Sequence, residues 1–191
     1  MVKTPSTMLE IGTQAADFRL PDPVTNRHIS LSDFDGKPLL VVFACNHCPY
    51  VIHLLASFTE YANAVQQQGL SVVMINANDV EHYPADSPEK MVALAADYSF
   101  QFPYLYDQSQ SVAMAYRAVC TPDFFLFDYQ HTLVYRGQYD GSRPGSQEPV
   151  SGVDLKAACD ALLAGKAISA SQSPSMGCSI KWREGNQPDY F

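Results

Sequence analysis

The stretch PLLVVFACNHCPY, residues 38–50, decides the fold of this 191-residue chain. Its first part is a continuous β-rich apolar run, the pattern of a strand that is buried on both faces. Cys45 and Cys48 follow that strand with Cys-x-x-Cys spacing. Apolar residues then recur at helical spacing over residues 51–65. The sequence therefore predicts a strand, a cysteine pair and a helix that begins near Cys48.

Strands and helices alternate along the rest of the chain. The sequence predicts a hairpin (17–20 and 28–31) and strands at 70–75, 102–105, 123–128 and 132–137. It also predicts three helices: one that begins after a cap at Asp86 or Ser87, one at 111–116, and a last one that ends at Gly165. Such alternation indicates an α/β fold, in which helices cover both faces of one sheet. Functional sites in such sheets lie at the carboxyl ends of strands, and the cysteine pair occupies that position.

The chain divides into one domain and a tail. We predict a single domain over residues 1–168, which starts with an irregular lead-in at 1–16 and the hairpin. The Ser-rich segment 169–175 is typical of a flexible arm. It leads to the sequence MGCSIKW, and we expect the whole tail, 169–191, to pack on the domain.

Charge and hydropathy restrict the partners and the compartment. The chain carries 12 Lys and Arg against 20 Asp and Glu, a net charge of −8, which argues against nucleic acid or an anionic membrane as the main partner. The longest apolar stretch, 39–45, is too short to cross a bilayer, and no secretory signal precedes it. We therefore expect a cytoplasmic protein. Cysteines are reduced in that compartment, so a Cys-x-x-Cys pair indicates redox chemistry or metal binding.

The cysteine pair has the features of a redox centre. A thiolate is the nucleophile in disulfide chemistry, and its pKa falls at a helix N-terminus, beside a cation, or in a Cys-x-x-Cys pair. Cys45 is placed for all three effects, because His47 adds positive charge when it is protonated. We expect Cys45 to attack a disulfide and Cys48 to resolve the resulting mixed disulfide.

Two other interpretations of the pair stay open at this point. Both cysteines can be inert, or they can form half of a metal site that needs two more ligands. The available ligands for that site are Cys120, Cys178 and His53, none of which has a recognisable spacing. No Gly-rich phosphate loop or dinucleotide fingerprint is present, so no organic cofactor is expected and electrons must come from another thiol system.

Four motifs carry a resemblance to a known family: VVFACNHCPY, AVCTPDFFLFD, YRGQYDG and GCSIKW. Over residues 10–165 the chain resembles the thioredoxin-like superfamily, and within it the peroxiredoxin-like proteins of the alkyl hydroperoxide reductase/thiol-specific antioxidant (redoxin) family. The resemblance implies a thioredoxin-like fold with a central mixed β-sheet flanked by helices. It also implies that Thr121-Pro122 is a cis-proline that faces the cysteine pair and pairs with the substrate backbone, which makes Pro122 a site residue.

The sequence departs from peroxiredoxins at the residues that activate peroxide. Aligned on Cys48, the positions of the peroxiredoxin Pro and Thr hold Val41 and Cys45, and the position of their Arg holds Pro122. The resemblance therefore favours disulfide exchange over peroxide reduction.

A second departure is from thioredoxins, which place a buried acid where this chain has Leu39. The proton acceptor for Cys48 is then left open among His47, His53 and water.

Three further cysteines lie outside the pair. We interpret Cys159 as a core residue, and Cys120 either as a third thiol or as a small packed side chain. Cys178 is either a resolving thiol or part of an apolar anchor with Ile180 and Trp182, and the anchor is the favoured interpretation.

The sequence as a whole predicts a thiol–disulfide oxidoreductase that acts on protein or small-molecule disulfides and thiols. The alternatives are a thiol peroxidase acting on peroxides and a metal-binding module that uses the cysteine pair. The oligomeric state is not predicted.

Overall fold

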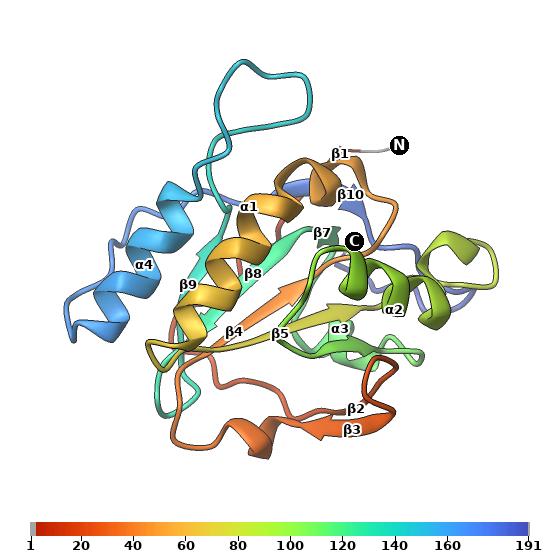
Figure 1. The fold of residues 1–191 in the computed structure, drawn as a ribbon, viewed down its shortest axis with the longest axis horizontal. Helices are drawn as coiled ribbons and strands as arrows, with labels where there is room; N and C mark the ends of the chain where they lie inside the picture. Colours follow the sequence, from red (N-terminus) through yellow and green to blue (C-terminus); the bar gives the residue numbers. More distant parts are fainter. Residues whose placement is uncertain (1–2, 191) are drawn as a thin grey trace.

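A five-stranded mixed sheet organises residues 3–190, the part of the chain that the computed structural model describes (Figure 1). Its strand order is β6-β5-β4-β8-β9, with β4 at the centre. The strands are β4 (Leu39–Phe43), β5 (Ser71–Asn76), β6 (Tyr104–Tyr106), β8 (Asp123–Phe127) and β9 (Leu133–Gly137). β4 pairs in parallel with β5 and antiparallel with β8. The predicted central mixed sheet is confirmed.

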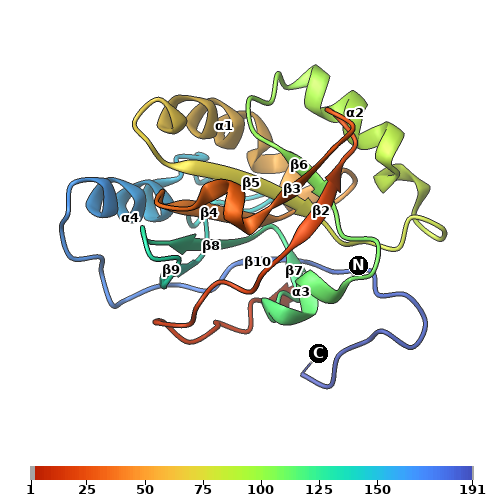
Figure 2. The ribbon, with the colours of Figure 1, turned by 90° about the horizontal axis from the view of Figure 1, so that it is seen from below.

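Helices cover both faces of this sheet (Figure 2). The helices are α1 (Pro49–Gln66), α2 (Pro88–Asp97), α3 (Ser111–Ala115) and α4 (Val153–Leu163), with 3-10 turns η1 (Leu31–Phe34) and η2 (Pro84–Asp86). Alternate residues of β4 point to opposite faces. Leu40 and Val42 pack with α1, α2 and α4, whereas Leu39 and Val41 pack with α3 and the N-terminal segment. Burial on both faces explains why the strand is apolar throughout.

The predicted N-terminal hairpin is present, with a small shift along the chain. β2 (Arg19–Asp22) pairs antiparallel with β3 (Arg27–Ser30). Leu20 is buried against the α3 face of the main sheet, so the hairpin closes that side of the core.

A second small sheet was not predicted. Its order is β1-β10-β7, formed by β1 (Lys3–Pro5), β10 (Met176–Ser179) and β7 (Cys120–Thr121). The expectation of an irregular lead-in at 1–16 is therefore wrong for residues 3–5. β1 pairs with a strand from the far end of the chain, and three residues are too few to show an alternating pattern. Residues 1 and 2 of the predicted lead-in lie outside the described residues.

The tail runs along the main sheet before it reaches β10. Arg136 of β9 donates hydrogen bonds to Gln172, and the amide of Gln138 donates to the carbonyl of Ser173 (3.0 Å). Beyond β10, Ile180 is buried and Trp182 packs against the same apolar cluster. The predicted apolar anchor is confirmed for Ile180 and Trp182, whereas Cys178 packs in the cluster on the opposite face of the sheet, which also contains Cys45 and Cys48. The predicted boundaries, 1–168 and 169–191, include residues 1, 2 and 191, which lie outside the described residues.

Among residues 3–190, no helix combines the length and the apolar character needed to span a membrane.

Candidate active site

The cysteine pair lies at the carboxyl end of the central strand. Cys45 is two residues beyond β4, and Cys48 is the N-cap residue of α1. Pro49 occupies the first helical position, where its missing N–H removes no helical hydrogen bond. Both cysteines are buried, with relative exposures of 1% and 0%. The predicted junction of strand, cysteine pair and helix is confirmed.

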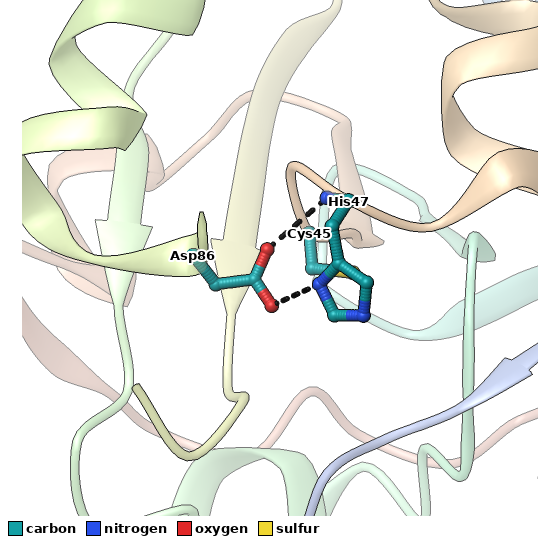
Figure 3. A group of neighbouring side chains, drawn as sticks. All are labelled: Cys45, His47 and Asp86. Atoms are coloured by element: carbon teal, nitrogen blue, oxygen red, sulfur yellow. Dashed lines mark hydrogen bonds and ion pairs between the residues drawn. The ribbon is translucent and has the colours of Figure 1, made fainter. Parts of the chain in front are cut away.

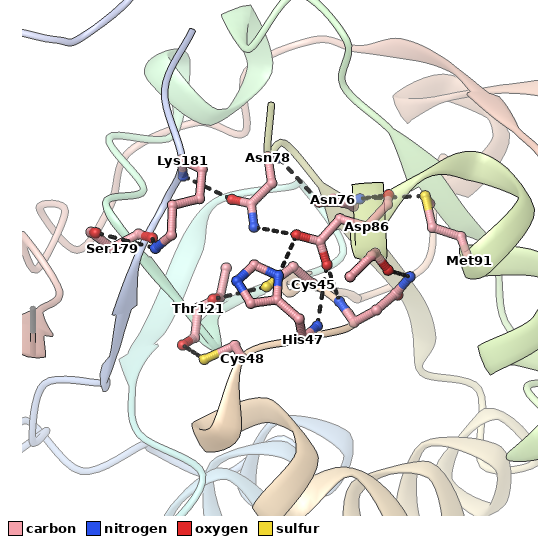
Figure 4. Close-up of polar contacts among 12 residues, drawn as sticks. Cys45, His47, Cys48, Asn76, Asn78, Asp86, Met91, Thr121, Ser179 and Lys181 are labelled. Carbon is pink, nitrogen blue, oxygen red and sulfur yellow. Dashed lines mark hydrogen bonds and ion pairs between the residues drawn. The ribbon is translucent and has the colours of Figure 1, made fainter. Parts of the chain in front are cut away.

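The loop before β8 faces the two sulfur atoms (Figure 4). The Thr121–Pro122 peptide bond is cis, as the family resemblance implied. Thr121 contacts both cysteines: its Oγ1 lies 3.5 Å from Cys45 Sγ, and its carbonyl oxygen accepts a hydrogen bond from the Cys48 thiol at 3.1 Å. The structure therefore brings Cys45, Cys48 and Pro122 to one place.

His47 points to a buried carboxylate, that of Asp86 (Figure 3). The distance from His47 Nδ1 to Asp86 Oδ2 is 2.7 Å. The same carboxylate accepts hydrogen bonds from the backbone amides of Asn46 (2.8 Å) and His47 (3.2 Å) and from the side-chain amide of Asn78 (2.8 Å). Asp86 therefore fixes both the turn between the cysteines and the orientation of the imidazole ring.

Sequence reasoning considered Asp86 only as a helix cap. The cap of α2 is Ser87, and Asp86 turns instead toward a loop forty positions earlier in the chain. No local spacing signals such a contact. The side chain of Asn76, at the end of β5, adds a hydrogen bond to the Asp86 carbonyl (2.8 Å), so the ends of β4 and β5 together build the site.

His53, a predicted candidate for the proton acceptor, is engaged elsewhere. Its Nε2 lies 2.8 Å from Ser142 Oγ, in the loop between β9 and α4. By contrast, a ring nitrogen of His47, the Cys45 sulfur and an Asp86 oxygen all lie within 4.8 Å of one another. His47 is therefore the histidine that the structure places beside the cysteine pair.

The surroundings favour a thiolate on Cys48. A hydrogen bond from the Cys45 thiol lowers the pKa of Cys48 most, and the Cys178 thiol and the Val51 amide add to the effect against the cost of burial, giving about 5. The pKa of Cys45 is raised well above its ordinary value by the hydrogen bond with Cys48, by burial and by the Asp86 carboxylate. These shifts favour the negative charge on Cys48, whereas the sequence argument placed it on Cys45.

Comparison with known proteins identifies the family. A family model described as the AhpC/TSA family matches residues 11–136, which include the cysteine pair and the cis-proline loop. The chain belongs to the AhpC/TSA family. This confirms the resemblance inferred from the motifs, and membership of the AhpC/TSA family supports a thiol-based redox function.

Two solved structures resemble this AhpC/TSA family protein over nearly its whole length. An uncharacterized conserved protein from Geobacillus kaustophilus is 45% identical, with a TM-score of 0.94, and the match covers 96% of this chain and 97% of that chain. A hypothetical protein from Sinorhizobium meliloti 1021 is 47% identical, with a TM-score of 0.93 and coverage of 95% and 100%. The similarity to these two proteins therefore extends well beyond residues 11–136, the span of the AhpC/TSA match.

A more distantly related solved structure shows which fold the chain has. A thiol:disulfide interchange protein of the thioredoxin family from Chlorobium tepidum TLS is 15% identical, with a TM-score of 0.62 and coverage of 81% of this chain and 98% of that chain. The AhpC/TSA family protein therefore has a thioredoxin-like fold, as predicted. No curated protein matches the sequence.

The thiolate on Cys48 can be tested by titration. We expect the ultraviolet absorbance of a thiolate to appear with a midpoint near pH 5, about four pH units below the ordinary cysteine value of 9.0. The signal should be absent from a Cys48→Ser variant of this AhpC/TSA family protein. A midpoint that survives in Cys48→Ser and disappears in Cys45→Ser would instead place the charge on Cys45.

A second buried acid follows the cis-proline. Asp123 begins β8, accepts a hydrogen bond from Ser6 Oγ (3.0 Å), and has a pKa raised to about 7 by burial.

The raised pKa of Asp123 predicts a pH dependence of stability. Between pH 3.8 and about pH 7, the Asp123 carboxyl is ionised in the unfolded chain but keeps its proton in the folded protein. Rising pH across this range should therefore lower the free energy of unfolding, by about 1–4 kcal/mol. Urea unfolding at about pH 4.5 and about pH 8 should show that the difference in free energy of unfolding between wild type and Asp123→Asn changes with pH. A constant difference would contradict the assignment.

The three groups around Asp86 have the chemistry of metal ligands, but their bonding disfavours a cation. Cys45, His47 and Asp86 place their ligand atoms within 4.8 Å of one another. Both carboxylate oxygens already accept hydrogen bonds, two at Oδ1 and two at Oδ2. A cation bound at Oδ2 in this AhpC/TSA family protein would displace the His47–Asp86 hydrogen bond and compete with the Asn78 amide for the same oxygen. This bonding argues against a cation at Cys45, His47 and Asp86, whereas the metal-binding alternative that uses the pair Cys45 and Cys48 stays a prediction.

Proposed function

We propose that this protein is a thiol–disulfide oxidoreductase whose Cys45–Cys48 pair cycles between dithiol and disulfide. The observation that carries the proposal is the meeting of both sulfurs with the Thr121–Pro122 loop, at 3.5 Å for Cys45 and 3.1 Å for Cys48. The substrates are protein or small-molecule disulfides, and another cellular thiol system supplies the electrons.

The first step uses the sulfur that carries the charge. The Cys48 thiolate attacks one sulfur of the substrate disulfide and forms a mixed disulfide, while the other substrate sulfur leaves as a thiolate and takes up a proton. This order reverses the one expected from the sequence. The reason is that hydrogen bonds with Cys45, Cys178, Thr121 and the Val51 amide lower the pKa of Cys48, whereas the hydrogen bond with Cys48, burial and the Asp86 carboxylate raise the pKa of Cys45.

The second step closes the disulfide. Cys45 loses its proton and attacks Cys48 Sγ, so that the Cys45–Cys48 bond forms and the second substrate thiol leaves. His47 is the group placed to receive the Cys45 proton, because a ring nitrogen lies within 4.8 Å of the sulfur. Asp86, 2.7 Å from Nδ1, would then stabilise the imidazolium as a charge-assisted pair. Pro122 orients the substrate beside the pair.

A reaction with one simple disulfide tests this function. Fully reduced protein would be mixed with bis(2-hydroxyethyl) disulfide, quenched with acid, alkylated and mapped by mass spectrometry. We expect wild type to release mercaptoethanol and gain a Cys45–Cys48 disulfide. Cys48→Ser should react at least about 100-fold more slowly, because the thiolate is lost, whereas Cys45→Ser should still form an adduct on Cys48.

Two outcomes would overturn parts of the proposal. An adduct that forms on Cys45 at the wild-type rate in Cys48→Ser would make Cys45 the attacking sulfur. Wild type that forms neither an adduct nor a disulfide, although it is folded and reduced, would rule out disulfide exchange.

A thiol peroxidase is the second candidate, and one observation favours it. The sulfur with the lowered pKa, Cys48, is the one that aligns with the peroxidatic cysteine of peroxiredoxins. Attack of this thiolate on a peroxide would break the O–O bond, release water or an alcohol and leave a sulfenic acid, which Cys45 would convert to the disulfide with loss of water. Stopped-flow oxidation with stoichiometric hydrogen peroxide separates the candidates: fast formation of a Cys48 sulfenic acid supports the peroxidase, and slow oxidation supports disulfide exchange.

A further inference from the structure

The tail strand brings a third thiol to the cysteine pair. β10 pairs antiparallel with β7, so that Cys178 lies opposite Thr121, the residue that contacts both active-site sulfurs. The Cys178 thiol is buried and lies within hydrogen-bonding reach of the Cys48 sulfur.

The backbone around Cys178 fixes this position from both sides. On one side, Gly177 lies so close to the cis-proline loop that a Cβ atom there would be 1.9 Å from the Thr121 carbonyl oxygen. On the other side, β1 pairs with β10, and Lys3 lies opposite Cys178. Because β10 is the middle strand of the small sheet, Cys178 is held at the site rather than carried on a loose tail.

Cys48 is consequently the central sulfur of a group of three. The thiols of both Cys45 and Cys178 lie close enough to Cys48 to lower its pKa by hydrogen bonding, and all three belong to one buried cluster. Cys45 and Cys178 each have access to the same sulfur, and thiol–disulfide exchange needs just such an attacking thiol next to a disulfide.

We propose that Cys178 is a third redox-active thiol, which competes with Cys45 for a disulfide bond to Cys48. The inference rests on the proposed function, because Cys48 must first be oxidised. In the exchange, Cys178 loses its proton and attacks Cys48 Sγ. The Cys48–Cys178 bond forms, and the sulfur previously bound to Cys48 leaves as a thiolate and takes up a proton. The leaving sulfur is that of a substrate or of Cys45, and no further oxidant is needed.

The charges around Cys178 favour its reaction after Cys48 has been oxidised. Burial, together with the hydrogen bond and negative charge of Cys48, raises the pKa of Cys178 to about 12, while the Lys181 ammonium opposes the rise. Once Cys48 is part of a disulfide its negative charge is gone, whereas Lys181 remains. Cys178 therefore releases its proton more readily at the stage when it is needed as a nucleophile.

The test follows an adduct on Cys48 in the absence of Cys45. Reduced Cys45→Ser and Cys45→Ser/Cys178→Ser would each be treated with bis(2-hydroxyethyl) disulfide, quenched at intervals and mapped by mass spectrometry. We expect the mercaptoethanol adduct on Cys48 to disappear from the single variant as a Cys48–Cys178 disulfide forms. The adduct should last at least about tenfold longer in the double variant, because a neighbouring thiol acts at high effective concentration. Cys45→Ser/Cys159→Ser is the matched control, since Cys159 is a buried thiol of α4, and it should behave like Cys45→Ser.

The outcomes separate this inference from the proposed function. Equal adduct lifetimes in all three variants would exclude a role for Cys178, while a Cys45–Cys48 disulfide in wild type would still support the oxidoreductase. If no protein, including wild type, reacts with the probe, the proposed function fails and the inference fails with it. Should Cys178→Ser prevent folding, oxidised wild type gives the answer, because the complete absence of a Cys48–Cys178 bond among its mapped disulfides would overturn the proposal.

Discussion

Replacing Asp86 with alanine is expected to lower the free energy of unfolding by about 3–5 kcal/mol. The carboxylate is fully buried and accepts hydrogen bonds from two backbone amides, the Asn78 side chain and His47. Alanine would leave these donors without an acceptor inside the protein, where each unsatisfied group costs about 1–3 kcal/mol. Urea unfolding followed by circular dichroism would measure the loss.

Asp160→Ala is the matched control for this prediction. Asp160 is an exposed acid on α4, and its replacement should change stability by no more than about 0.5 kcal/mol. The Asp86 prediction would be contradicted if both variants were equally stable. Asp86→Asn separates charge from hydrogen bonding: removal of the carboxylate charge should lower the pKa of Cys45 while an acceptor oxygen remains.

Replacing Gly177 with alanine is the second substitution with a large expected effect. The new Cβ would lie 1.9 Å from the Thr121 carbonyl oxygen and 2.5 Å from the carbonyl carbon, and both are backbone atoms that cannot rotate away. Either β10 or the cis-proline loop has to move. We expect a loss of about 1–3 kcal/mol in the free energy of unfolding, and faster proteolysis of the tail beyond residue 168.

The same substitution should weaken the connection between Cys178 and Cys48, and slower formation of their disulfide in a Cys45→Ser background would show it. Gly141→Ala is the control, because there the Cβ would meet only the end of the flexible Glu148 side chain, at 2.7 Å. A Gly177→Ala protein with wild-type stability and an intact tail would mean that β10 is not tightly held against Thr121.

The sequence revealed the centre of this fold because the decisive signals there are local. β4 is apolar throughout since both of its faces are covered, and α1 begins at Pro49, one residue after the cysteine pair. Each feature is indicated by a pattern within about a dozen consecutive residues, where periodicity and proline position are informative. The cis-proline loop, by contrast, was foreseen only through the resemblance to a family.

The parts that sequence reasoning missed depend on distant contacts. Asp86 reaches a loop forty positions away, and β1 pairs with a strand at the opposite end of the chain. The proposed location of the thiolate on Cys48 also depends on distant contacts. A helix N-terminus can be read from the sequence, but the carboxylate beside Cys45 and the thiol beside Cys48 appear only when the chain is folded.

The position of β10 within the small sheet also has a consequence for the newly made chain. Translation delivers residues 45–48 early and residues 176–179 late, and at about 5–20 residues per second the delay is on the order of ten seconds. Throughout that interval Cys48 lacks the thiol that later lies next to it, and β7, once it is made, still waits for its β10 partner. The nascent protein therefore presents Cys45 and Cys48 before Cys178 exists, and the group of three sulfurs is complete only when the last strand has been synthesised.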